Sequence, residues 1–269
     1  MAKLEGQHAL VTGAGSGLGR AIAHALAGEG ARIAVVDLDG ARAERTLGEI
    51  GGRGLALAGD VADPAAVRGW FQETLRRFGR LEILVNNAGY VDARPELQER
   101  GRRIAEQVVS GRGQETPLDA TATLDDAAWR RMLAVHLDGT FFCTREALRA
   151  MTARRYGRIV NMASIAGLTG IASVPHYSAA KGGIIAFTKA VAREVARLGI
   201  AVNAIAPGYI DTPLLDAIDP AGRALLAAAV PMGRFGRPEE VVPTALLLVD
   251  PASAFLTGQV VSPNGGEVM

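Results

Sequence analysis

The opening of the chain constrains the fold most strongly, because it combines two short apolar runs with a cluster of glycines. The run at residues 8–12 is bounded by glycine and predicts a strand. The glycines of 13–19 follow it and lead into a helical pattern that stops at further glycines. A second apolar run, 32–37, ends in Asp37. This order of strand, glycine turn, helix and strand predicts a βαβ unit with two parallel strands.

The glycine turn indicates a binding chemistry. Glycines let the backbone approach a pyrophosphate, and the amides at a helix N-terminus attract its charge. Asp37 could accept hydrogen bonds from both ribose hydroxyls of an adenosine. The pattern, Thr12-Gly13-x-x-x-Gly17-x-Gly19, departs from the strict G-x-G-x-x-G fingerprint. Glycine turns also occur where they only tighten the packing of a helix on a strand. Here the second strand ends in an acid, Asp37, and this combination favours a dinucleotide site.

Strands and helices alternate along the rest of the chain. Further strands are predicted at 55–58, 81–86, 158–164, 200–206 and 259–262. Further helices are predicted around 67–78, 125–151 and 238–249, with one more around Tyr177. This alternation predicts an α/β fold, a doubly wound parallel sheet with helices on both faces. Since no repeat or linker interrupts the pattern, we expect 1–269 to form a single dinucleotide-binding and catalytic domain.

Composition and charge disfavour several classes of protein. Hydrophobic residues make up 49% of the 269, and the net charge is +1 without any basic run, so we expect no nucleic-acid partner. No apolar run reaches the roughly 18 residues of a membrane span, and the polar start does not resemble a signal peptide, so we expect no membrane partner. Cys143 is the only cysteine, which excludes an intramolecular disulfide. We expect a cytoplasmic protein.

Three residues form a candidate catalytic set. Tyr177 and Lys181 are four apart and share one face of a helix that Pro175 can begin. Ser164 ends the apolar run that precedes this helix. A phenol with a pKa near about 10 is a poor base, but a neighbouring ammonium favours the phenolate and lowers that pKa. The tyrosine could then exchange a proton with an alcohol or ketone whose oxygen the serine holds.

A tyrosine and a lysine at this spacing also occur by chance on many helices, so the other motifs decide the interpretation. They are Thr12-Gly13-x-x-x-Gly17-x-Gly19, Asp60, Asn86-Asn87-Ala88-Gly89, Ser164, Tyr177-x-x-x-Lys181 and Pro207-Gly208. Together they resemble the short-chain dehydrogenase/reductase family, in its order and spacing, over nearly the whole chain. The resemblance implies a Rossmann-type sheet of about seven parallel strands and a nicotinamide cofactor.

The resemblance also implies which residues would contact that cofactor. Around the first turn and after the second and third strands they would be Gly13, Ser16, Gly17, Leu18, Gly19, Asp37, Leu38, Asp60 and Val61, with the last two at the adenine. Further along they would be Asn86, Asn87, Ala88, Gly89, Tyr177, Lys181, Pro207, Gly208, Ile210 and Thr212, with the last two at the carboxamide. No metal is expected.

The chain departs from the family pattern at His136, where the family's catalytic tetrad has an asparagine. There the family's backbone carbonyl binds a water that would link Lys181 to solvent. A histidine side chain, with an unperturbed pKa near about 6.5, could join this proton relay and add an acid limb to the pH–rate profile. The alternative is that the carbonyl does this work and the ring only fills space.

A second departure is an insertion at about 92–123, which is longer than the usual family link. Part of it, 95–109, could form a helix with four apolar residues near one face, namely Leu97, Ile104, Ala105 and Val108. The insertion could be a solvated surface element or one wall of the substrate entrance. Residues of about 209–237 are apolar and flanked by proline and glycine, so they suit a lid over the substrate.

The expected function is an NAD(H)-dependent oxidoreductase that interconverts a secondary alcohol and a ketone by hydride transfer. Tyr177 would be the acid/base and Ser164 a hydrogen-bond donor to the substrate oxygen. Lys181 would hold the nicotinamide ribose and lower the pKa of the tyrosine. Alternatives are an NADPH-dependent 3-oxoacyl-carrier-protein reductase and a catalytically silent binding or regulatory protein on the same fold. Alcohols, steroids, sugars and acyl thioesters remain possible substrates.

Cofactor choice and assembly can also be predicted. Asp37 would repel a 2′-phosphate, and Ser16 lies where NADP-dependent members often carry Arg or Lys. Arg42 and Arg45 are the counter-argument, although we expect them to face solvent. Small residues on the Tyr177 helix permit close helix approach, and the family commonly pairs such helices across a two-fold axis. We therefore expect a homotetramer.

Overall fold

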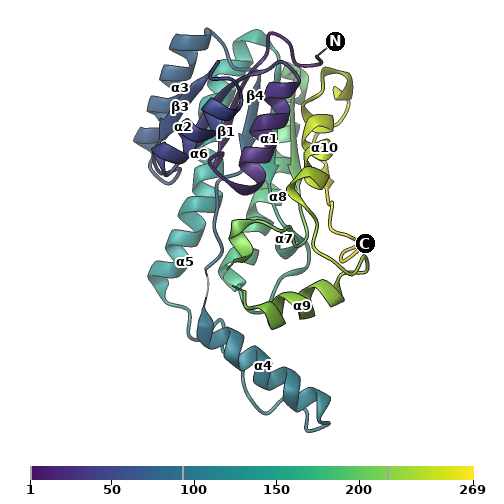
Figure 1. Cartoon of the computed structure of the whole chain (residues 1–269). Coiled ribbons are helices and arrows are strands. Elements are labelled where there is room, and N and C mark those ends of the chain that lie inside the picture. The colour runs from purple at the N-terminus through teal and green to yellow at the C-terminus, as the bar shows by residue number, and fades with distance from the viewer. Residues whose placement is uncertain (1, 93, 217) are drawn as a thin grey trace.

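The computed structural model describes residues 2–92, 94–216 and 218–269, and these contain a seven-stranded sheet (Figure 1). In chain order its strands are β1 (His8–Thr12), β2 (Arg32–Asp37), β3 (Leu55–Ala58), β4 (Ile83–Asn86), β5 (Gly157–Met162), β6 (Ile200–Ile205) and β7 (Val260–Val261). All neighbouring pairs are parallel, in the order β3-β2-β1-β4-β5-β6-β7. The direction of travel reverses between β1 and β4, which creates a topological switch point. The predicted fold class is confirmed.

Helices cover both faces of this sheet. They are α1 (Gly17–Gly28), α2 (Gly40–Glu49), α3 (Pro64–Phe78), α4 (Pro95–Val109), α5 (Asp126–Leu133), α6 (Gly139–Met151), α7 (Ile165–Thr169), α8 (Pro175–Val195), α9 (Pro220–Ala229) and α10 (Pro238–Val249). Helices α1 and α10 pack into one hydrophobic core, whereas α3, α6 and α8 pack into the other. Along β1, Val11 belongs to the first core and Leu10 to the second. Burial on both faces explains why the strands are continuously apolar.

The close approach of α1 to the end of β1 requires glycine. Gly13 has φ +62°, a conformation that side chains rarely adopt. A Cβ on Gly19 would lie 2.2 Å from the carbonyl oxygen of Gly13, so the first turn of α1 rests directly on backbone. Ser16 precedes the helix in an extended conformation. The first amides of α1 are thereby presented at the carboxyl edge of the sheet.

The helix expected at 125–151 is continuous but changes its winding at its centre. Between α5 and α6, residues Ala134–Asp138 form one π-helical turn that includes His136. The hydroxyl of Thr140 donates to the carbonyl oxygen of His136 at 2.7 Å. Such π-turns redirect backbone groups and often occur at functional sites. The sequence departure at His136 therefore coincides with a local departure from α-helical geometry.

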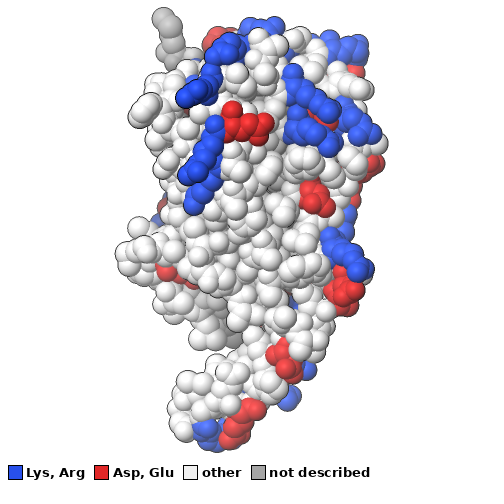
Figure 2. Space-filling model, turned by 180° about the vertical axis from the view of Figure 1, so that it is seen from behind, with Lys and Arg blue, Asp and Glu red and all other residues white. Residues whose placement is uncertain are grey.

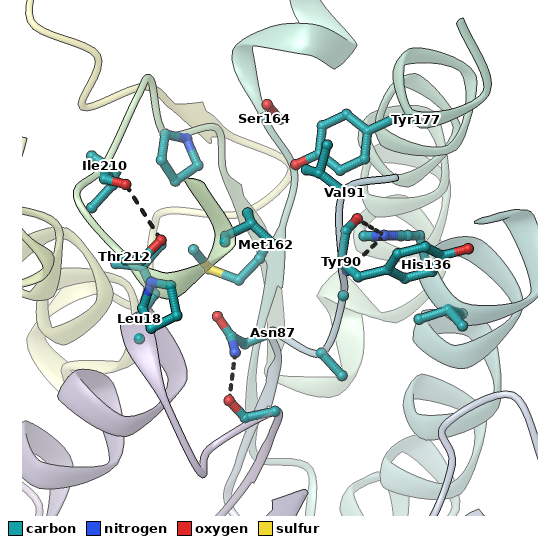
Figure 3. A pocket seen from close by; sticks show the side chains of 18 of the residues that line it. Leu18, Asn87, Tyr90, Val91, His136, Met162, Ser164, Tyr177, Ile210 and Thr212 are labelled. Atoms are coloured by element: carbon teal, nitrogen blue, oxygen red, sulfur yellow. Dashed lines mark hydrogen bonds between the residues drawn. The ribbon is translucent and has the colours of Figure 1, made fainter. Parts of the chain in front are cut away.

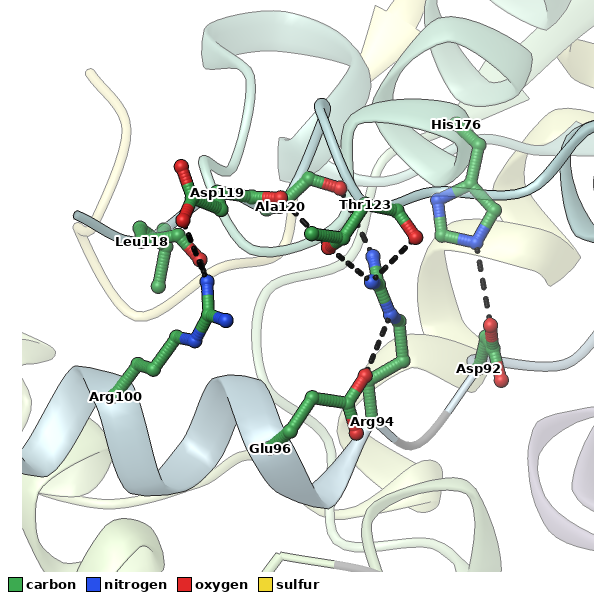
Figure 4. Close-up of polar contacts among 9 residues, drawn as sticks. All are labelled: Asp92, Arg94, Glu96, Arg100, Leu118, Asp119, Ala120, Thr123 and His176. Carbon is green, nitrogen blue, oxygen red and sulfur yellow. Dashed lines mark hydrogen bonds and ion pairs between the residues drawn. The ribbon is translucent and has the colours of Figure 1, made fainter.

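The insertion forms an arm that projects beyond the carboxyl end of the sheet, where α4 extends away from α9 (Figure 1). Helix α4 occupies the expected range 95–109, but the expected apolar face is packed only at its root, because Leu97 is 5% exposed whereas Val108 is 57% exposed. Two arginines of the arm, Arg94 and Arg100, bind its returning segment near Ala120 (Figure 4). Within the described residues no helix combines the length and apolarity needed to cross a membrane.

Candidate active site

A cavity of about 770 Å³ opens at the carboxyl ends of the strands (Figure 3). It is bounded by the glycine turn, by the exits of β2 to β5, by α8 and by the chain that follows β6. Ligands of open parallel sheets bind at this edge, next to the switch point. The cavity therefore lies where the sequence analysis expects a dinucleotide.

The exits of β1 and β4 are tied together by side-chain hydrogen bonds. The hydroxyl of Thr12 accepts from the backbone N–H of Asn87 at 3.0 Å and of Ala88 at 3.1 Å. The amide of Asn87 donates to the carbonyl oxygens of Thr12 and Gly13, both at 3.1 Å. These bonds hold the glycine turn against Ala88, and a Cβ on Gly13 would lie 2.8 Å from the Cα of Ala88.

The structure brings the three candidate catalytic side chains together on one wall of the cavity (Figure 3). Ser164 caps α7, and its hydroxyl accepts from the backbone N–H of Ala166 at 3.1 Å. Tyr177 and Lys181 lie one turn apart on α8, with the lysine Nζ 5.5 Å from the phenol ring centroid. The Nζ also donates to the carbonyl oxygen of Met162 at 2.6 Å. The serine hydroxyl and the tyrosine phenol face the same part of the cavity.

Burial dominates the electrostatics of this pair. It raises the pKa of Tyr177 to about 12, against a smaller lowering by the hydrogen bond with Ser164. It also lowers the pKa of Lys181 to about 7. The expectation that the lysine lowers the tyrosine pKa is therefore wrong for the protein alone, because desolvation penalises the charged form of both groups. The phenol is therefore protonated at neutral pH, and burial weakens the preference of the lysine for its charged form.

The opposite end of the cavity contains an oriented carboxylate. Asp37 accepts from the backbone N–H of Gly15 at 2.8 Å and from that of Asp39 at 3.1 Å. The Arg42 side chain is 55% exposed, as expected, and pairs with Asp39 at 3.3 Å. It also lines the cavity beside Asp37. Arg45 is exposed, as expected.

Most residues expected at a cofactor line the cavity, with two exceptions. The lining includes Gly13, Ser16, Gly17, Leu18, Asp37, Leu38, Asp60, Val61, Asn87, Ala88, Gly89, Tyr177, Lys181, Pro207, Gly208, Ile210 and Thr212. Gly19 lies behind the turn, where it permits packing on Gly13. Asn86 is buried beneath the cavity, where its amide donates to Asn161 at 2.8 Å and to Thr144 at 3.1 Å. Its role is to join the strands β4 and β5 to α6.

Sequence reasoning missed other parts of the lining. Arg131 reaches the cavity from α5 and pairs with Asp60 at 2.7 Å. No local pattern marks this arginine, since the contact joins residues 71 positions apart. Tyr90 also lines the cavity, and its place directly after the Asn-Asn-Ala-Gly motif could have indicated this.

His136 holds the chain that leaves β4. Its Nε2 lies 2.8 Å from the carbonyl oxygen of Tyr90 and 3.1 Å from the Tyr90 backbone N–H (Figure 3). One ring nitrogen either donates or accepts in a given tautomer, whereas an asparagine amide could serve both groups at once. The Nδ1 has no hydrogen-bond partner among the described residues. Burial first, and then the charge of Lys181, lower the pKa of His136 well below its usual value, which favours a neutral positioning role over a titrating one.

Comparison with known proteins decides the family. Residues 7–222 match the family model described as short chain dehydrogenase. The chain is 37% identical, over 98% of its length and 97% of the relative, to a subunit of (2S)-[(R)-hydroxy(phenyl)methyl]succinyl-CoA dehydrogenase from Thauera aromatica. It is 38% identical, over 96% and 95%, to cis-4-hydroxycyclohexanecarboxylate dehydrogenase from Sinomonas cyclohexanicum. The chain belongs to the short-chain dehydrogenase/reductase family.

A solved structure agrees with this assignment. The 3-ketoacyl-(acyl-carrier-protein) reductase of Brucella melitensis, complexed with NADH, superposes with a TM-score of 0.85 at 31% identity, covering 99% of this chain and all of that one. As a short-chain dehydrogenase/reductase, the protein is an oxidoreductase that acts on CH–OH groups with a nicotinamide cofactor. The cavity fits that group, because the glycine turn is open where a Cβ would fill it and faces an oriented carboxylate.

The buried, neutral state of His136 predicts a pH dependence of stability. Below about pH 6.5 an unfolded histidine binds a proton that native His136 does not, so the native state loses stability as pH falls. His136→Asn removes this loss. Between pH 7 and 5.5 the wild type should therefore lose about 1 kcal/mol more unfolding free energy than the variant.

Thermal unfolding at fixed protein concentration measures this difference in stability. His24→Asn, a change at a 39% exposed side chain, is the control. Parallel stability curves for wild type and His136→Asn would contradict the prediction.

Proposed function

We propose that the protein is an NAD(H)-dependent dehydrogenase that interconverts a secondary alcohol and a ketone, with Tyr177 as the acid/base. One observation supports this most directly. Ser164, Tyr177 and Lys181 share one wall of a cavity whose far end contains the carboxylate of Asp37. When bound, the nicotinamide carries the hydride. The protein positions the substrate oxygen and manages its proton.

The proton chemistry follows from the environment of each side chain. The phenol of Tyr177 is protonated at neutral pH, so in ketone reduction it is ready to give its proton to the substrate oxygen. Ser164 donates a second hydrogen bond to that oxygen and stabilises its developing charge. Lys181 uses one N–H on Met162 and retains others for ribose hydroxyls. Such contacts favour its charged form, which assists phenolate formation in alcohol oxidation.

Two substitutions test these roles. Tyr177→Phe should remove at least 95% of turnover and leave the NADH dissociation constant within about twofold, because the phenol acts on the substrate proton. Lys181→Ala should lower turnover and weaken NADH binding, because its ammonium serves both the cofactor and the tyrosine. Tyr156→Phe is the matched control, since that phenol contacts Gln7 outside the cavity. Steady-state rates and NADH fluorescence titration provide the two readouts. A Tyr177→Phe enzyme with more than a few per cent of the wild-type rate would reject the acid/base role.

The preference for NAD(H) rests on Asp37. Its carboxylate is held by two backbone amides, so it cannot easily turn away from a 2′-phosphate. Arg42 lines the same end of the cavity but shares its charge with Asp39. A fixed carboxylate beside a half-exposed, paired guanidinium favours the ribose diol over the phosphate.

We expect kcat/KM to be at least tenfold higher with NAD(H) than with NADP(H), about 1.4 kcal/mol in transition-state stabilisation. Asp37→Asn keeps the shape of the side chain and removes the repulsion, so it should narrow this ratio. Arg42→Ala should widen it, because the remaining phosphate-binding charge is lost. Initial rates with both cofactors measure the ratios. Equal or faster wild-type turnover with NADP(H) would exclude the proposal.

The alternative, a 3-oxoacyl-carrier-protein reductase, is favoured by the similarity to the Brucella reductase. Because that reductase is complexed with NADH, a preference for NADH would not exclude this activity. The reductase and the alcohol dehydrogenase can be distinguished by their rates. The rate of reduction of an acetoacetyl thioester is compared with the rate of oxidation of simple secondary alcohols. A catalytically silent protein is disfavoured, because Ser164, Tyr177 and Lys181 are all present and placed together.

We also propose that the chain works as one domain in which 209–237 forms a lid and the arm walls one side of the entrance. None of the described side chains of α9 is buried, although Leu226 lines the cavity. Arg102 of the arm lies 3.5 Å from Asp219, the residue that caps α9. At the root of the arm, Asp92 lies 3.7 Å from the buried His176 of α8 (Figure 4). These contacts connect the arm both to the lid and to the catalytic helix.

The arm can be tested with a matched pair of variants. Arg102 and Arg103 both pair with Glu99, but of the two only Arg102 has an ion pair with the lid in the described structure. Arg102→Ala should change KM for bulky alcohols by two- to fivefold, since an exposed ion pair contributes at most about 1 kcal/mol. Arg103→Ala should leave KM unchanged, and both should bind NADH normally. Replacing 92–123 by a tight turn should give a larger change of the same kind. Unchanged kinetics across a series of substrate sizes would make the arm a surface decoration.

We infer a cytoplasmic homotetramer. Ala179 and Ala186 of α8 are exposed, and the neighbouring Phe141 of α6 is 41% exposed and lies edge-to-face with Phe187. Figure 2 views the molecule from behind, and the centre of that face carries few charges. Small and aromatic side chains exposed on neighbouring helices suit close pairing of two copies. Light scattering at micromolar concentration should give four times the 28.0 kDa of one chain, and a monomeric mass would reject the assembly.

A further inference from the structure

The charges that line the cavity are concentrated at one end. The charged residues of the lining are Asp37, Arg42, Asp60, Arg131 and Lys181. Asp37 ends β2 and Asp60 follows β3, while Arg42 and Arg131 contact these acids or their neighbours. This end of the cavity is the one proposed above for the adenosine. Four of the five charged side chains therefore lie at the end proposed for the cofactor and not at the substrate end.

The sheet order separates this charged end from the catalytic residues. Asp37 ends β2, and Ser164 follows β5. These two strands are three positions apart in the sheet. At about 4.8 Å per strand, this places the two ends roughly 14 Å apart. The guanidinium of Arg131 pairs with Asp60, which follows β3, one strand further from β5 than β2 is.

The fifth charge, Lys181, is also not available to a substrate substituent. Its side chain is 4% exposed and lies behind Tyr177, and its Nζ donates to Met162. Its remaining donors face the position proposed for the ribose. A carboxylate attached some carbons away from the reacting carbon would not contact it.

The substrate end itself is apolar. It is lined by aliphatic side chains from the start of α8 and from the lid, namely Ile171, Val174, Leu214, Leu215, Ile218 and Leu226. The polar side chains there, besides the catalytic pair, include Ser173 and His136, whose ring centroid lies 5.3 Å from that of Tyr177. Arg223 of the lid is bound to Asp211 and to the carbonyl oxygen of Leu215 and does not line the cavity. Within residues 2–92, 94–216 and 218–269, no Arg or Lys lines this end.

We propose that the substrate is a secondary alcohol whose carbinol carbon carries apolar, uncharged groups, and that compact anionic alcohols are rejected. The proposal rests on the dehydrogenase function given above. An anion enclosed by these aliphatic side chains would lose its hydration without gaining a partner, which disfavours binding of an unpaired charge. An acidic group is tolerated only on a substituent long enough to leave the cavity.

Three cyclohexanols that differ at one position test the inference. The 4-substituent, cis to the hydroxyl, is methyl, carboxamide or carboxylate. The amide and the carboxylate have nearly the same shape, so their ratio isolates charge. We expect kcat/KM with NAD⁺ to be at least tenfold higher for the amide than for the acid, and highest for the methyl compound. Binding of the matching ketones to the NADH complex, read by cofactor fluorescence, gives the same ranking without turnover.

Neighbouring leucines of α9 provide the matched variants. Leu226 lines the cavity, whereas Leu225 is 64% exposed and points away from it. Leu226→Arg adds a cation at the substrate end and should narrow the amide-to-acid ratio at least fivefold. Leu225→Arg adds the same charge outside the cavity and should leave the ratio unchanged.

The outcomes separate this inference from the proposed function. Oxidation of the acid at a rate equal to or above that of the amide overturns the uncharged substrate class and leaves the dehydrogenase function standing. Failure of all three probes to bind or react, in an enzyme that binds NADH, also overturns the inference, because an apolar cavity should accept the methyl compound. Failure to bind NADH or NADPH would reject the proposed function itself.

Discussion

The hydrogen bonds between Thr12 and Asn87 determine the geometry on which the rest of the site depends. They join the ends of β1 and β4, the two strands between which the sheet reverses its order. On one side they fix the glycine turn and the first amides of α1. On the other they fix the chain from Ala88 to Tyr90, which His136 holds from below. The positions of both halves of the cavity therefore depend on the hydrogen bonds made by one hydroxyl and one amide side chain.

Buried polar groups around this joint are mutually satisfied to different degrees. Asn86, Asn161 and Thr188 form a chain of hydrogen bonds that links β4, β5 and α8 beneath the cavity. Such a network rigidifies the strands that carry the catalytic residues. The catalytic pair above this network is affected mainly by desolvation, since burial raises the pKa of Tyr177 and lowers that of Lys181. Rigid strands thus support side chains whose protonation states are sensitive to what binds beside them.

Much of this architecture could be predicted from the sequence. The bounds of β1, β2, β3 and α10 follow from apolar runs that end at glycine, proline or an acid, and the structure reproduces them. Helix α9 was missed because an alanine-rich segment between proline and glycine has no apolar periodicity to distinguish it from a loop. The orientation of Arg42 and the pair between Arg131 and Asp60 could not be predicted, since both depend on how distant elements meet. The sign of the Tyr177 shift was also missed, because burial cannot be read from a four-residue spacing.

The position of His136, which holds Tyr90, also restricts which substitutions the protein can accept. A Cβ on Gly89 would lie 2.3 Å from the Cε1 of His136, so the imidazole occupies the space that any side chain at residue 89 would need. We therefore expect the effects of substitutions at residues 89 and 136 to be coupled. Replacing the histidine by a smaller residue frees that space, whereas adding a side chain at position 89 first would displace the ring and release Tyr90. A side chain at residue 89 is therefore sterically compatible only with a residue smaller than histidine at 136.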